Sequence, residues 1–227
     1  SSIITVIFSE TLDSTTIGAA TFTLSSGGAS VTGTIRYSGT TAIFIPSSSL
    51  SYSTTYTATI TTGVKDVSGN AMSSNYTWSF TTESAPDSTA PSGSITINSG
   101  ASYTNLTTVS LGLSATDNGG VTGYYVSDSS TTPSASASGW TSVTSTTSYS
   151  ATVSYSLSSG EGGKTIYVWY KDAAGNVSST ANATITYDTT VPTVTISSPT
   201  SGSTYTATSS TISLGGSASD SSSGISS

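Results

Sequence analysis

Residues 171–188 read KDAAGNVSSTANATITYD, and this stretch decides the fold. It opens with an Asp-x-x-Gly-Asn turn, in which the aspartate can accept backbone N–H groups and the glycine can adopt a positive φ. An alternating segment follows, and its apolar residues Ala183, Ile185 and Tyr187 would share one face of a strand. A nearly identical hexapeptide, KDVSGN, occupies residues 65–70. The two copies predict two β-domains of similar design, each with this turn between its last two strands.

The same period-two alternation runs through most of the chain. In SATVSYSL, residues 150–157, every second residue is apolar, and the first part of the chain repeats the pattern in TVIF, TFTL, TIRY, AIFIP, YTATI and YTWSF. No stretch has an apolar stripe of helical period. Hydrophobic residues make up 33% of the chain and include 13 Tyr and 3 Trp, which is enough to form cores. Short strands separated by Gly, Ser and Asn turns predict an all-β protein built from antiparallel sandwiches.

An internal repeat of about one hundred residues sets the expected domain boundaries. DSTAP at 87–91 recurs as DTTVP at 188–192, and TVSLGLSATDNGG at 108–120 parallels TISLGGSASDSSS at 211–223. A repeat of this period is typical of a tandem array, and the Pro-containing pentapeptides are typical of linkers. The predicted organisation is domain 1 at 1–83, a linker at 84–91, domain 2 at 92–187 and a partial domain 3 at 188–227.

Two stretches resemble known families. Residues 3–82, through ITVIFSETLD, ATFTL, AIFIPSSSLSYSTTYTATI, GVKDVSGNAM and WSFTT, resemble the bacterial Ig-like domain associated with surface-layer proteins. Residues 90–187, which end in YVWYKDAAGNVSSTANATITY, are similar to another bacterial Ig-like class found in long secreted arrays. The resemblance implies tandem Ig-like β-sandwiches and makes each KD..GN turn an F–G hairpin. It says little about function, because Ig sandwiches have many unrelated roles.

The resemblance also implies which aromatic residues face outward. Within TIYVWYKD, Ile166, Val168 and Tyr170 are expected inside, which leaves Tyr167 and Trp169 on the outer face. Paired exposed rings can stack on sugars or contact proteins. A register slip of one residue would instead place these two rings in the core. The remaining large aromatics expected in the core are Trp78, Phe80 and Trp140.

Both ends of the chain are expected to lack strands. By the family pattern, domain 1 is missing its first strand, and domain 3 has only about two strands, too few to form a core alone. One explanation is that the sequence is a window on a longer array. The other is that the C-terminal strands of one chain complete domain 1 of the next, which would polymerise subunits into a filament.

Aspartates recur at equivalent places in the repeats. Asp87 precedes the first strand of domain 2, Asp117 follows its second strand, and Asp172 lies in its F–G turn, so all three should meet at one pole. Clustered carboxylates favour a bound cation, and Ca²⁺ prefers oxygen ligands. The sequence therefore predicts calcium at the junction of domains 1 and 2, or else three unrelated Asx turns. The other acidic or amide residues considered are Asn118 and Glu83 near this site, Asp188 and Asp220 for a second calcium at the junction of domains 2 and 3, and the domain 1 counterparts Glu10, Asp13 and Asp66.

The composition excludes several classes of function. The chain has no His and no Cys, so imidazole bases, Ser/His/Asp triads and zinc held by His or Cys are absent. Its acids fall in turns and linkers instead of facing each other across a cleft, so no enzyme is expected. A net charge of −7 disfavours nucleic acid, and no apolar window is long enough to enter a membrane.

The expected function is a non-enzymatic structural segment, as a stalk, spacer or part of an adhesin, outside a prokaryotic cell or on its surface. Its partners would be neighbouring Ig-like domains of the same or an adjacent chain, with a surface ligand or polysaccharide as a further candidate. Two alternatives stay open at this point. They are a filament subunit that polymerises by strand donation and an accessory carbohydrate-binding module of a secreted hydrolase.

Overall fold

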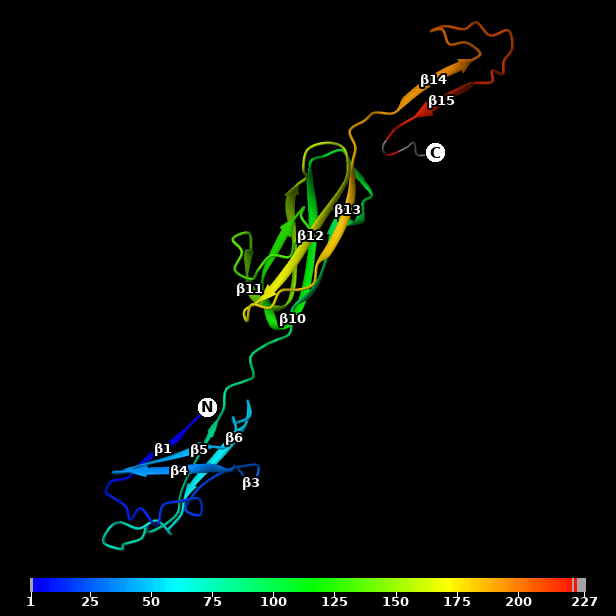
Figure 1. The fold of residues 1–227 in the computed structure, drawn as a ribbon. Helices are drawn as coiled ribbons and strands as arrows, with labels where there is room; N and C mark the ends of the chain where they lie inside the picture. The colour runs from blue at the N-terminus through cyan, green and yellow to red at the C-terminus, as the bar shows by residue number, and fades with distance from the viewer. Residues whose placement is uncertain (1, 222, 224–227) are drawn as a thin grey trace. The chain divides into compact units, whose positions relative to one another are not determined.

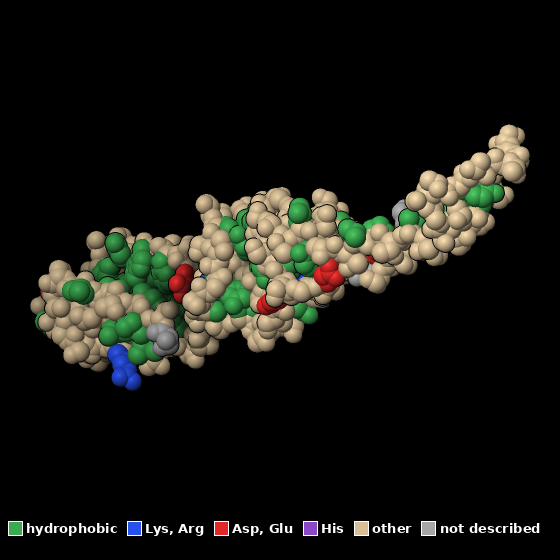
Figure 2. Space-filling model, turned by 90° about the horizontal axis from the view of Figure 1, so that it is seen from above, with side chains coloured by type: hydrophobic (Ala, Val, Ile, Leu, Met, Phe, Trp, Pro, Cys, Tyr) green, Lys and Arg blue, Asp and Glu red, His purple; other side chains and the backbone are tan. Residues whose placement is uncertain are grey.

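The computed structural model describes residues 2–221 and 223, and it is built of strands and turns. The chain divides into two compact units, Ser1–Pro86 (unit 1) and Asp87–Ser227 (unit 2), and the boundary falls inside the predicted linker 84–91. The face seen in Figure 2 is covered mostly by backbone and uncharged polar side chains. Among the described residues, helical structure is limited to η1, Asn98–Gly100, which is far too short to span a membrane.

Unit 1 is a sandwich of two antiparallel sheets (Figure 1). One sheet has the order β1-β5-β4, with β1 at Ile4–Ile7, β5 at Thr41–Pro46 and β4 at Gly33–Ser38. The other has the order β3-β2-β6-β7, with β3 at Ala29–Ser30, β2 at Phe22–Ser26, β6 at Thr55–Ile60 and β7 at Tyr76–Thr81. The predicted alternation is confirmed, since alternate residues of β5 and β6 are buried.

The sheet of β6 and β7 has an aromatic inner face that packs on the core of unit 1 and an outer face lined by hydroxyls. Phe22 is fully buried, and its ring lies 5.6 Å from Phe44 and 6.2 Å from Trp78. Trp78 and Phe80 are partly buried and pack against this core, as expected. On the outer face of β6 and β7, Thr and Ser side chains pair across the strands as Thr55–Thr81, Thr57–Ser79 and Thr59–Thr77.

Unit 2 contains a larger sandwich, in which two long strands pass from one layer to the other. Its elements are β8 at Ser92–Ile97, β9 at Tyr103–Thr104, β10 at Thr108–Ser127, β11 at Thr141–Ser156, β12 at Gly162–Asp172 and β13 at Ala181–Tyr187. The first half of β10 pairs with β8 and with the second half of β11. After a register shift between Thr116 and Val121, its second half pairs with β12 and the first half of β11. β13 joins β12, and β9 adds to β13 in parallel.

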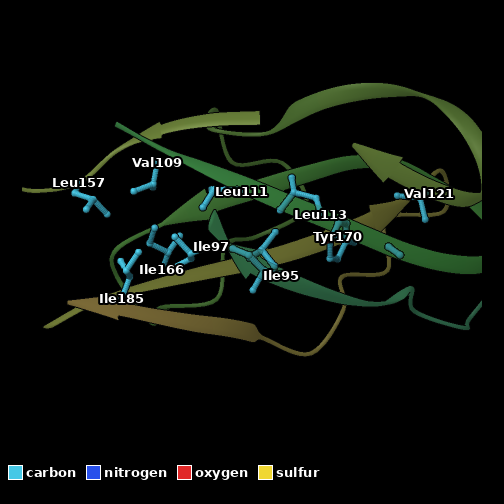
Figure 3. Packing of buried hydrophobic residues seen from close by; sticks show 12 residues of the cluster. Ile95, Ile97, Val109, Leu111, Leu113, Val121, Leu157, Ile166, Tyr170 and Ile185 are labelled. Carbon is cyan, nitrogen blue, oxygen red and sulfur yellow. The ribbon is translucent and has the colours of Figure 1, made fainter. Parts of the chain in front are cut away.

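The core of unit 2 lies between these layers (Figure 3). Leu111 and Leu113 of β10 are buried there, and so are Ile166 and Tyr170 of β12, as the alternation predicts. The Tyr170 hydroxyl donates a 2.6 Å hydrogen bond to the Ser94 carbonyl on the opposite layer. Burial raises the pKa of the Tyr170 hydroxyl well above its usual value, so this donor keeps its proton.

Neither of the two placements left open for Trp169, an open ring or a place in the main core, is what the structure shows. Trp169 does point away from the main core, but it is 0% exposed. Its ring stacks on Tyr167, with 6.2 Å between centroids, and meets the edge of Tyr125. Tyr125 in turn contacts Trp140, which lies in the connection between β10 and β11. A second, smaller aromatic cluster therefore forms on the outer face of the sheet.

A lysine holds this outer cluster in place. The Nζ atom of Lys171 lies 4.8 Å from the Trp140 ring centroid and donates to the Ala135 carbonyl. Trp140 is consequently partly buried and does not belong to the main core, contrary to expectation. Lys171 is itself partly buried in this contact.

The third repeat forms a hairpin of its own, β14 at Thr193–Ser198 and β15 at Gly215–Ser219. Val194 and Ile196 of β14 are 73% and 45% exposed. By the DSTAP/DTTVP repeat, Ile196 corresponds to Ile95 of β8, which is buried in the unit 2 core, and Val194 corresponds to Gly93. Part of the predicted domain 3, residues 222 and 224–227, lies outside the described residues. The predicted domain boundaries beyond the division at 86/87 stay a prediction.

Candidate metal centre

Asp117 lies where β10 bends from one layer to the other. Its Oδ2 atom accepts hydrogen bonds from the backbone N–H groups of Gly119 and Gly120, at 2.9 and 2.8 Å. Gly120 has φ +98°, which a residue with a side chain rarely adopts, so the bend needs glycine at this point. Asp117 is only 8% exposed. The bend thus forces a carboxylate into the end of the sandwich.

Asp172 reaches the same place from β12. The register between β10 and β12 pairs Val121 with Asp172, so the end of β12 lies beside the β10 bend. Asp172 also organises the turn that the sequence predicts. Its Oδ1 accepts the Asn176 backbone N–H at 2.8 Å, and its Oδ2 accepts the Asn176 side-chain amide at 2.7 Å. Gly175, in the turn between them, has φ +92°.

Asp87 arrives from the segment before β8. Ser92 of β8 pairs with Thr116 of β10, which carries the preceding residues past the β10 bend. The Asp87 carboxylate accepts the Thr89 backbone N–H at 2.9 Å and the Asn118 amide at 3.2 Å, and these bonds lower the pKa of Asp87 below its usual value. The Asn176 amide donates to the Asp87 carbonyl at 3.1 Å.

The three aspartates form one group, which we call the carboxylate cluster (Asp87, Asp117, Asp172). One carboxylate oxygen from each lies within 4.8 Å of the other two. Two buried oxygens, Asp87 Oδ2 and Asp117 Oδ1, have no hydrogen-bond partner among the described residues. The sequence thus predicted correctly which three residues meet, and the bound metal stays a prediction.

The positive charges of unit 2 are used elsewhere. The Nζ atom of Lys171 donates to the Ala135 carbonyl, and that of Lys164 donates to Ser158 and Ser159. The remaining basic residues of the chain, Arg36 and Lys65, belong to unit 1. The carboxylate cluster therefore gathers like charges at close range, which is unfavourable unless a cation joins them.

Gly119 provides the space that Asp87 occupies. A Cβ atom at this position would lie 2.1 Å from Asp87 Oδ2, well inside contact distance. A side chain here would thus push the Asp87 carboxylate away from the other two. The role of Gly119 was not predicted, and its only signal in the sequence is the Asn-Gly-Gly run after Asp117.

The other predicted acidic residues do not join a group of this kind. Asp188 repeats the conformation of Asp87, with its Oδ1 accepting the Thr190 N–H at 2.9 Å, and it is buried. Asp220 accepts the Ser223 N–H at 3.0 Å. Among the described residues, the one set of three or more carboxylates close enough to share a metal is the carboxylate cluster. The second calcium site, with Asp188 and Asp220, stays a prediction.

Glu161 is a linker contact that sequence reasoning missed. Its carboxylate accepts hydrogen bonds from the backbone N–H of Thr189 at 2.8 Å, from the Thr189 hydroxyl and from the Thr190 hydroxyl at 3.0 Å. These bonds, first of all that from the Thr189 hydroxyl, lower the pKa of Glu161. Only the Gly-rich surroundings of Glu161 in the sequence suggested a turn at this position.

In unit 1 the corresponding acids each serve a local turn. The Asp13 carboxylate accepts the Thr15 hydroxyl and N–H, which lowers the pKa of Asp13. Asp66 bonds to its own turn, and Glu83 contributes its backbone carbonyl to the Ser53 N–H. Neither these residues nor Glu10 belongs to a metal-binding group among the described residues.

Comparison with known proteins supports the fold. Residues 1–82 match the model of a family described as bacterial Ig-like domain. No curated protein sequence matches the chain. The chain is similar to the solved S-layer protein rSbsC, with TM-score 0.32 and 14% identity over 86% of this chain and 40% of that one. The chain is also similar to a structure of surface layer protein SbsC, domains 1–6, with TM-score 0.32 and 16% identity over 86% of this chain and 40% of that one.

The chain is also similar to the solved structure of native alpha-2-macroglobulin from Escherichia coli, spanning domains MG0-NIE-MG1. Its TM-score is 0.33 and its identity 15%, over 86% of this chain and 68% of that one. The chain spans well under half of each S-layer structure.

Proposed function

We propose that the chain is a non-enzymatic structural segment of a prokaryotic cell-surface or extracellular protein, in which tandem Ig-like domains act as a spacer. The observation that carries the proposal is that the two sandwiches have separate hydrophobic cores on either side of a linker of a few residues. Such an arrangement can span a distance and bear force, and it needs no reactive group. The match of residues 1–82 to a bacterial Ig-like family supports it.

Surface labelling of intact source cells tests this role. An antibody against residues 92–187 should bind intact cells, and mild protease treatment of those cells should remove the signal. Labelling that requires permeabilised cells would contradict the proposal. A cytoplasmic protein probed in parallel should be labelled only after permeabilisation, which verifies that the cells were intact.

A second candidate function is self-assembly by strand exchange, and a groove in unit 1 favours it. The edge strands β1 and β7 belong to different sheets and border a groove of about 350 Å³, lined by Thr5, Val6, Ile7, Tyr76 and Trp78. Ile7 and Tyr76 are 75% and 61% exposed. An extended strand added here would pair with free backbone groups and cover these side chains.

The β14–β15 hairpin of a second copy suits this groove. It exposes Val194 and Ile196, and neither the hairpin nor the groove carries a charged side chain, so two acidic chains could meet there without repulsion. Light scattering after size-exclusion chromatography should then show concentration-dependent oligomers. Ile7→Lys and Val194→Lys should each abolish them. A chain that stays monomeric at every concentration would exclude this candidate.

The carbohydrate-binding alternative receives less support. The ring pair Tyr167 and Trp169 was its main candidate, and Trp169 presents no free face to a sugar. Pull-down with insoluble polysaccharides remains the direct test.

A further inference from the structure

The carboxylate cluster contains two oxygens whose interactions are incomplete. Asp117 Oδ1 and Asp87 Oδ2 are buried without a hydrogen-bond donor among the described residues. Buried polar atoms are nearly always paired, because leaving one unpaired forfeits its hydration. Asp117 is less than one-tenth exposed, and its paired oxygen, Oδ2, is already held by the β10 bend. The free oxygen therefore indicates a ligand that binds at the cluster.

A cation satisfies this requirement better than water does. A water molecule could donate hydrogen bonds to the two free oxygens, but it would leave the repulsion among three carboxylates uncompensated. The two lysines of unit 2 are engaged elsewhere. The donor atoms are all carboxylate oxygens, with no His or Cys in the chain, and this set favours a hard divalent ion over zinc or copper.

The spacing suits calcium. Two oxygens bound to one Ca²⁺ can lie up to about 5 Å apart, which is twice the usual Ca–O distance of about 2.3–2.6 Å. The cluster oxygens lie within 4.8 Å of one another, which is inside this limit. Mg²⁺ usually keeps several of its waters, whereas Ca²⁺ readily accepts several carboxylates.

We infer that Asp87, Asp117 and Asp172 bind one Ca²⁺ ion in unit 2. The ion would join three elements that the backbone brings together: the segment before β8, the bend of β10 and the β12–β13 turn. It would thereby fix the last part of the linker to the sandwich that follows. Such a site would bind Ca²⁺ whether or not the chain lies at a cell surface, so its test is separate from that of the proposed function.

Calorimetric titration of the whole chain, after removal of divalent ions with EDTA and dialysis, tests the site. CaCl₂ should bind with a dissociation constant of about 10⁻⁴–10⁻³ M, the range of extracellular calcium modules, and MgCl₂ at least 10-fold more weakly. Saturating Ca²⁺ should raise the Tm of unit 2 and increase hydrogen-exchange protection in residues 87–91, 117–120 and 172–176. Unit 1 peptides should not change.

Matched variants assign the binding to these residues. Asp117→Asn removes one charge at nearly constant shape, and Gly119→Ala displaces the Asp87 carboxylate. Each should weaken Ca²⁺ binding at least 10-fold. Asp66→Asn, in the corresponding turn of unit 1, and Gly163→Ala, where a Cβ meets nothing within 4 Å, should bind as the parent chain does. Asp87→Asn, at the more exposed edge, replaces Asp117→Asn if that variant fails to fold.

Several results would overturn the inference. Absence of both calcium-binding heat and a Tm shift in the parent chain would do so directly. Equal affinity for Mg²⁺ would exclude a calcium-selective site. Binding that survives Gly119→Ala together with Asp117→Asn or Asp87→Asn would place the ion elsewhere.

Discussion

The turns at 65–70 and 171–176 are built alike but lie in different surroundings. In each, the aspartate Oδ1 accepts the asparagine N–H at 2.8 Å and Oδ2 accepts the asparagine amide at 2.7 Å. Gly69 and Gly175 have φ of +89° and +92°. Only Asp172 lies beside two further carboxylates. The turn is thus fixed by its own six residues, whereas the site also requires a bent strand and a linker.

The largest expected effect is that Ca²⁺ reverses which of two alanine variants, at Asp66 or at Asp172, loses more of its Tm. Asp66→Ala and Asp172→Ala each remove hydrogen bonds from the turn. In EDTA, Asp172→Ala should lower the Tm less, because it also relieves repulsion in the carboxylate cluster. In Ca²⁺ it should lower the Tm more, because it removes a ligand. We expect the order to reverse by several degrees, measured by calorimetry with hydrogen exchange to assign each transition. The same order in both buffers would contradict a role for the cluster.

Next in size is an effect that should be equal in the two turns. Gly69→Ala and Gly175→Ala each force a side chain into the left-handed region, at about 1–2 kcal/mol. A Cβ at Gly69 meets nothing within 4 Å, and one at Gly175 only touches Ala135 at 3.8 Å, so backbone strain alone determines the cost. Urea unfolding followed by hydrogen exchange measures both. Clearly unequal costs would mean that the turns are not locally determined.

A smaller difference is expected between the two asparagines. Asn176 donates to the Asp87 carbonyl as well as to its own turn, and Asn70 bonds within its turn. Asn176→Ala should therefore cost about 1 kcal/mol more than Asn70→Ala, the value of one further hydrogen bond. Urea denaturation at equal ionic strength provides the comparison. An equal cost would show that the Asn176 contact to Asp87 adds no stability.

The smallest effect is the acid response of unit 1. The side-chain amide of Asn70, followed by its backbone N–H, holds the pKa of Asp66 below its usual value. The folded state then binds its proton less readily than the unfolded state, so this stability is complete above the unfolded pKa and is lost as pH falls through the folded one. The Tm of unit 1 should fall below about pH 4. The fall should be shallower in Asn70→Ala, and an unchanged slope would show that Asn70 does not set this pKa.

Much of the fold could be predicted, because alternation and turn chemistry are local. Ala183 and Ile185 face the core as the pattern indicates, and the two KD..GN turns form as expected. The meeting of Asp117 with Asp172 was also predictable, since an Ig topology brings their two loops to one pole. These features depend on sequence period and connectivity, both of which can be read from a single chain.

The remainder depends on contacts between distant segments. The family resemblance placed Trp169 on the outer face, but it could not show that the β10–β11 connection folds back over that face. The burial follows from Tyr125, Trp140 and Lys171, whose approach no local pattern indicates. In the same way, Asp117 Oδ1 has no hydrogen-bond donor because the β10 bend binds only Oδ2. Which oxygen of a carboxylate is paired depends on the three-dimensional structure and cannot be predicted from the sequence.

The hydroxyl pairs across β6 and β7 have a consequence for the environments that the protein tolerates. Thr57 and Ser79 satisfy one another at 2.9 Å without any formal charge. Dissolved ions screen attraction between charged groups, but they have little effect on a bond between two neutral hydroxyls. The stability that these hydroxyl pairs add to the sheet should therefore be nearly the same at low and at high salt concentration.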